Sequence, residues 1–128
     1  MAKPKKGDMP IKIKTIRVEG EIMAYGSKSI LHRKLTCYEG EKGTAYFADD
    51  RFKCSKDTLN VVWKAFKKLP KFAHTETETT LPLQKIVDVF EKRIRPDTKS
   101  ITDYRQKKMA EDYNKEIKGV VKELKKLV

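Results

Sequence analysis

The feature that most constrains the fold is a change in the spacing of apolar residues near Ser55. Before it, apolar and polar residues alternate in short runs, which is the pattern of strands with one buried face. After it, apolar residues recur every three or four positions, which is the pattern of amphipathic helices. In a chain of 128 residues, a run of strands followed by a run of helices predicts an α+β fold.

The first part of the chain predicts an antiparallel β-meander of three to four strands. Within its first run, the apolar positions shift from odd to even numbers near Thr15, which indicates a β-bulge or bend. The glycine-containing turn sequences YGSK and EGEKG and the pair Asp49-Asp50 separate the runs. The predicted strands occupy residues 11–22, 30–38, 44–48 and 51–54.

Three helices are predicted after the sheet, the last of them long. Ser55 is a suitable N-cap for the first helix, and Pro70 ends it. The segment HTETETT at 74–80 has no apolar face and is interpreted as an exposed loop or an edge strand. The caps of the last helix are expected within 97–100, and the helix carries a heptad-like apolar seam. The predicted helices span 55–69, 83–94 and about 101–127.

Length and composition indicate a single domain with a short basic tail. Residues 1–9 contain three lysines, one glycine and one proline, and we expect them to be flexible. Residues 10–128 are expected to form one α+β domain, with the sheet in 10–54 and the helical part in 55–128.

The charge points to an acidic partner. The net charge is +12, although a small domain needs a magnitude of only about 2 to 8 to stay soluble. Residues 51–75 contain seven Lys or Arg and one Asp, so +6 of that charge lies in this one segment. We therefore predict non-catalytic binding of nucleic acid, with single-stranded DNA or RNA favoured.

Nucleic-acid binding needs cations for phosphates and flat aromatic rings for unpaired bases. We expect the lysines of the first helix and the polar face of the sheet to supply them. Trp63 shares a helix face with Leu59 and Phe66 and is assigned to the core. The predicted binding residues are Arg33, Lys34, Tyr38, Tyr46, Lys53, Lys64, Lys67, Lys68 and Lys71.

The junction FKCSKDTLNVVWKAF, at 52–66, joins a strand to a capped amphipathic helix. This layout resembles the transcription-coactivator type of single-strand DNA-binding module, a four-stranded meander followed by one helix. The resemblance covers about residues 11–69 and concerns architecture, because no specific binding motif accompanies it.

A metal site and a nuclease are the chemical alternatives. His74, Glu76 and Glu78 alternate, so an extended chain places all three on one side as a candidate metal site. A metal-dependent nuclease would combine these carboxylates with Asp49 and Asp50. No phosphate-binding glycine loop and no nucleophile motif occur, so we predict no catalytic residues, no cofactor and no enzyme activity.

The remaining alternative is a small regulator or inhibitor that binds an acidic protein partner. The seam of the last helix also suggests a homodimer through that helix. No run of 18 apolar residues occurs, so no membrane span is expected. With only two cysteines and no signal peptide, we expect a soluble intracellular protein of the cytoplasm, nucleoid or nucleus.

Overall fold

A computed structural model describes residues 5–128, and residues 1–4 of the expected tail lie outside it. Within the described range, a five-stranded antiparallel sheet is combined with three α-helices, so the predicted α+β class is confirmed. The last helix is the long one, as predicted. A 3-10 turn at Lys6–Asp8 precedes the sheet. The elements are β1 (Pro10–Ala24), β2 (Ser27–Gly40), β3 (Gly43–Ala48), β4 (Phe52–Cys54), α1 (Lys56–Lys67), β5 (Ala73–Pro82), α2 (Leu83–Glu91) and α3 (Tyr104–Lys125).

The segment HTETETT forms an edge strand, which was one of its two predicted states. It lies within β5, which pairs antiparallel with β1, and the strand order is β4-β3-β2-β1-β5. Side chains are exposed along β5 from Ala73 to Thr80, which explains why this strand has no apolar face. The sheet therefore continues into the part of the chain that was expected to be helical.

The two longest strands pair without interruption. Their register runs from Lys12 opposite Glu39 to Ala24 opposite Ser27, with no residue skipped. The prediction of a bulge near Thr15 was therefore wrong, because every residue there has a single partner on each side. The turn at Tyr25 and Gly26 has φ values of 51° and 77°, and positive φ at both central residues is the geometry of a tight two-residue hairpin loop.

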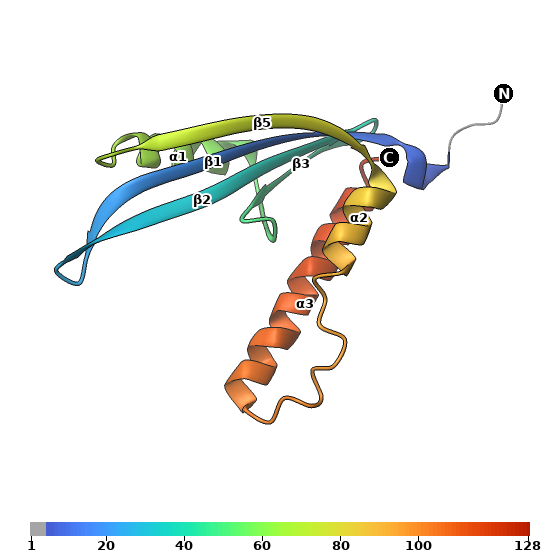
Figure 1. Ribbon diagram of the computed structural model, residues 1–128. Coiled ribbons are helices and arrows are strands. Elements are labelled where there is room, and N and C mark those ends of the chain that lie inside the picture. The colour runs from blue at the N-terminus through green and yellow to red at the C-terminus, as the bar shows by residue number, and fades with distance from the viewer. Residues whose placement is uncertain (1–4) are drawn as a thin grey trace.

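Two helical layers cover opposite faces of this ribbon, and this arrangement explains the shift of the apolar positions. Ile11 belongs to the main core with residues of α2 and α3, whereas Gly20 packs against Leu69, just after α1. Side chains of β1 alternate between faces, so odd positions face α2 and α3 while even positions face α1. Figure 1 shows α2 and α3 projecting from the end of the sheet where β5 stops, and the β1–β2 turn at the opposite end.

The apolar seam of α3 is used inside the chain. Ile117 and Leu124 are almost completely buried in the core that α2 and the sheet complete. A homodimer through this seam would have to displace that packing. The helix begins at Tyr104, capped by Asp103, later than the predicted start. No helix in residues 5–128 is long and apolar enough to cross a membrane.

Alanine substitutions at two glycines test the packing, because we expect them to change the free energy of unfolding in opposite directions. A Cβ added at Gly20 would lie 2.6 Å from the Cβ of Leu69, so we expect Gly20→Ala to lower the free energy of unfolding by about 1–3 kcal/mol. At Gly119 in α3 an added Cβ meets nothing within 4 Å, so Gly119→Ala is expected to raise it by about 0.5–1 kcal/mol. Urea unfolding measures both values. An unchanged stability of Gly20→Ala would contradict the close approach of Leu69 to β1.

Candidate nucleic-acid interface

The exposed side of α1 carries free lysines, as the sequence predicted. Leu59 and Phe66 turn toward the sheet and fix the rotation of the helix, which leaves Lys64, Lys67 and Lys68 exposed. Within residues 5–128, none of these three lysines forms an ion pair. Their charges therefore remain available to an anion.

A groove of about 360 Å³ separates α1 from the sheet, and we call it the α1 groove. Its wall combines two aromatic side chains, two lysines, an amide and one carboxylate. Figure 1 shows α1 beside the sheet, with β1 and β5 running past it. The α1 groove is lined by Lys14, Ile16, Leu35, Cys37, Tyr46, Lys56, Leu59, Asn60, Trp63 and Glu76.

Trp63 is half-buried and lines the groove, so it is not the core residue that was predicted. Its ring meets Phe72 and His74 edge-on, with centroid distances of 5.5 and 4.9 Å. The Nζ of Lys67 lies 4.8 Å from the indole centroid, within the range of a cation–π contact. The indole thus packs against two rings and lies beside an exposed cation.

The two predicted stacking tyrosines lie on opposite faces of the sheet. Tyr46 is half-buried in the α1 groove and pairs with Cys37 across β2 and β3. Tyr38 is 5 % exposed and packs edge-to-face against Phe47 and Phe90. Burial also raises the pKa of the Tyr38 phenol. The prediction that Tyr38 stacks on a base was wrong, because α2 covers the sheet face on which it lies.

Arg33 and Lys34 have internal partners. Arg33 forms an ion pair with Asp49, and the Nζ of Lys34 donates a hydrogen bond to the carboxylate of Asp50 at 2.7 Å. Asp50 is 8 % exposed, and Arg93 approaches the same carboxylate oxygen at 3.5 Å. These two predicted phosphate ligands are thus occupied by the turn that follows β3.

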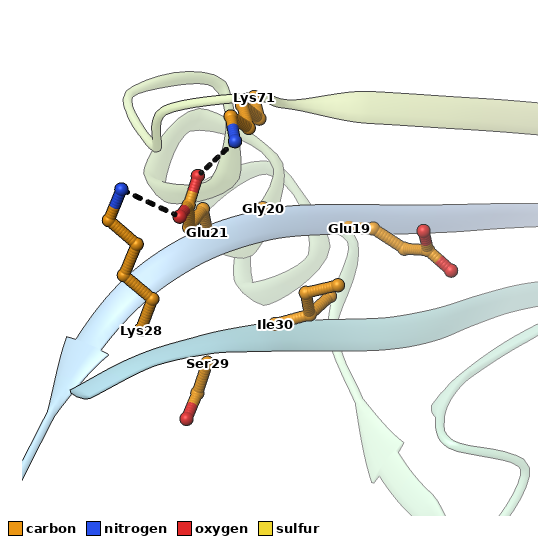
Figure 2. A pocket seen from close by; sticks show the side chains of 7 residues that line it. All are labelled: Glu19, Gly20, Glu21, Lys28, Ser29, Ile30 and Lys71. Carbon is orange, nitrogen blue, oxygen red and sulfur yellow. Dashed lines mark ion pairs between the residues drawn. The ribbon is translucent and has the colours of Figure 1, made fainter.

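Lys53 and Lys71 are also paired. Lys53 donates a hydrogen bond to Glu123 of α3 at 3.0 Å, and this contact holds the pKa of that carboxyl below its ordinary value. Lys71 lies 3.3 Å from Glu21, which it shares with Lys28 (Figure 2). Of the nine predicted residues, Lys64, Lys67 and Lys68 therefore keep exposed charges without an ion pair among residues 5–128, and Tyr46 lines the α1 groove with Trp63.

The candidate metal site does not assemble. His74, Glu76 and Glu78 alternate along β5, where side chains on one face lie about 6.6 Å apart. Glu78 is drawn to Lys12 at 3.1 Å, and the ring of His74 stacks on Phe72. Across residues 5–128, no three His, Cys, Asp or Glu side chains gather closely enough to hold a metal ion.

The carboxylates considered for a nuclease are likewise dispersed. Asp49 and Asp50 follow β3, whereas Glu76 and Glu78 lie on β5 at the far edge of the sheet. The two cysteines are free thiols on β2 and β4, and burial raises the pKa of both. A thiol with a raised pKa is a poor nucleophile at neutral pH because little thiolate is present.

Sequence reasoning missed Trp63, Lys14, Lys56 and Asn60 as groove residues. Their periodicity shows which side of an element is apolar, but it does not show where two elements leave a gap between them. Comparisons of the chain with protein-family models, with curated proteins and with solved structures find no match in any of the three.

Two lysine substitutions separate internal ion pairs from free surface charge. Lys34→Gln removes the closest cation from the buried Asp50, so we expect the free energy of unfolding to fall by about 1–3 kcal/mol. Lys64→Gln removes an unpaired exposed charge and is expected to change it by less than about 0.5 kcal/mol. Chemical denaturation of the two variants makes the comparison. Equal effects would contradict the assignment of Lys34 to the Asp50 cluster.

Proposed function

We propose that the protein binds single-stranded nucleic acid, without catalysing a reaction on it, through the α1 groove and the lysines of α1. The observation that carries the proposal is the half-buried Trp63, which lines the α1 groove with Tyr46, on a helix that also carries three exposed lysines without an ion pair among residues 5–128. Flat aromatic rings next to a track of cations are the combination that unpaired bases and their phosphates require. A duplex, whose bases are already stacked, would use the lysines but not the rings.

The roles of the α1 lysines and of the groove residues follow from their chemistry. Lys64, Lys67 and Lys68 contact successive phosphates along the exposed side of α1, and Lys14 and Lys56 do so at the mouth of the groove. A base that stacks on the indole displaces the ammonium of Lys67 from the ring toward a phosphate, so one side chain serves both contacts. Asn60 offers an amide donor and acceptor to a base edge.

The salt dependence of binding tests the lysines. Each lysine that contacts a phosphate of a single strand contributes about 0.7 to the slope of log K against log salt concentration. The triple variant Lys64→Gln/Lys67→Gln/Lys68→Gln is therefore expected to reduce the magnitude of the slope by about 2. Fluorescence anisotropy with labelled single-stranded DNA, RNA, duplex DNA and heparin at several salt concentrations gives the slopes.

The chain contains a matched control for this loss of charge. Lys115→Gln/Lys118→Gln/Lys122→Gln removes the same charge from exposed positions of α3, outside the α1 groove. This control is expected to keep most of the slope. Equal slopes for the two triple variants, or equal affinity for heparin and single strands, would contradict a specific nucleic-acid site on α1.

Trp63 is the only tryptophan in the sequence, so its substitution tests base stacking and its fluorescence reports binding. Trp63→Leu keeps an apolar side chain but removes the ring, and one base–aromatic stack contributes about 1–3 kcal/mol. We expect single-strand affinity to fall by about 5- to 150-fold, with little change for duplex DNA. In the native protein, Trp63 emission should change on titration with a single strand. Tyr38→Phe is the control, and a Trp63→Leu variant with native affinity would remove the groove from the site.

A further inference from the structure

One edge of the sheet is open along the β1–β2 hairpin. β3 pairs with β2 only from Leu35 to Gly40, so within residues 5–128 the stretch of β2 from Ser27 to Lys34 has β1 as its single neighbouring strand. That stretch is about 25 Å long. Figure 1 shows the hairpin extending past the shorter β3.

The backbone of this stretch points its hydrogen-bonding groups outward at every second residue. The N–H of Lys34 donates to the carboxylate of Asp49 at 3.1 Å, and the carbonyl of Lys34 accepts from the N–H of Asp49 at 2.6 Å. Lys34 thus faces away from β1. Because the register with β1 is unbroken, His32, Ile30 and Lys28 face the same way. Asp49 occupies only the first of these outward positions.

Two hollows lie along the open edge. One, of about 560 Å³, is lined by Glu19, Glu21, Lys28, Ile30 and other residues shown in Figure 2. The other, of about 290 Å³, is lined by residues around His32. Ile30, which lines the first hollow, has 72 % of its surface exposed, and an exposed large apolar side chain at a strand edge is available to pair with another chain.

Near the edge, single carboxylates each contact two cationic side chains. Glu21 contacts both Lys28 at 3.8 Å and Lys71 at 3.3 Å, as Figure 2 shows. Asp50 in the same way contacts both Lys34 and Arg93. Glu19 also lines both hollows, but the stretch Ser27–Lys34 itself carries Lys28, Arg33 and Lys34 and no carboxylate, so the edge remains basic.

We propose that this edge, the β2 edge at Ser27–Lys34, receives an extended acidic segment of a partner protein as an additional antiparallel strand. Main-chain hydrogen bonds would supply much of the affinity, and the side chains of the edge would set the specificity. Lys28 and His32 favour acidic residues directly opposite them, and Ile30 favours an apolar residue between these two. The preferred segment therefore reads acidic-x-apolar-x-acidic. Pairing with a second copy of the same edge is disfavoured, because it would bring two basic edges together.

The probe is a labelled peptide with the core Glu-Thr-Val-Thr-Glu, which reads the same in both directions. Anisotropy measures its binding, and hydrogen–deuterium exchange of the full chain measures protection of residues 27–34. We expect saturable binding together with slower exchange at the outward amides of Ile30 and His32. Binding without this protection, or no binding, would overturn the proposal.

Two N-methylated peptides separate strand addition from simple charge attraction. Methyl groups on the Glu and Val amides block the hydrogen bonds that face β2, so we expect binding to weaken by about tenfold or more. Methyl groups on the Thr amides, which face solvent in an antiparallel pair, should leave binding nearly unchanged. This test uses the native protein. Equal affinities of the two methylated peptides would overturn the proposal.

Protein variants localise the site. Ile30→Pro removes an outward N–H but no hydrogen bond to β1, so the hairpin should persist while peptide binding is lost. Lys64→Gln/Lys67→Gln/Lys68→Gln should bind the peptide like the native protein, and Ile30→Pro should bind single-stranded nucleic acid like the native protein. Loss of peptide binding in the α1 triple variant would overturn the assignment to the β2 edge.

Discussion

The pairing of β1 with β2 is the constraint on which the rest of the structure depends. Thirteen residue pairs connect them, from Lys12–Glu39 to Ala24–Ser27, in a single register. Because side chains alternate across this ribbon, it offers one apolar face to α2 and α3 and the opposite face to α1. The helices pack at different ends of the ribbon, so neither face is covered along its whole length (Figure 1).

This staggered packing creates both surfaces to which we assign partners. The α1 groove exists because α1 covers only part of its face and leaves Tyr46 and Trp63 half-buried along the groove wall. The β2 edge is open because β3 stops at Ala48, after which the chain turns through Asp49 and Asp50 with positive φ values of 54° and 63°. The two surfaces involve different elements, so a nucleic acid and a protein segment can be tested separately.

The sequence predicts those features of the candidate site that depend on a single helix or strand. The lysines of α1 follow from helical spacing, and the cap at Ser55 follows from the residue type: its hydroxyl accepts the Thr58 N–H at 3.2 Å. Tyr38 could not be predicted as buried, because its strand position resembles that of an exposed platform residue. What covers it is α2, whose Phe90 meets the Tyr38 ring with a centroid distance of 6.3 Å.

The sequence by itself determined the spacing of apolar residues, the turns, the helix caps and the basic charge of α1, and these suffice for the α+β class. Only the tertiary structure decided which layer covers each strand face and which cations keep a free charge. The physical reason is distance along the chain. Periodicity is a local property, whereas an ion pair such as Lys53–Glu123 joins residues 70 positions apart, and only the packed fold brings their opposite charges together.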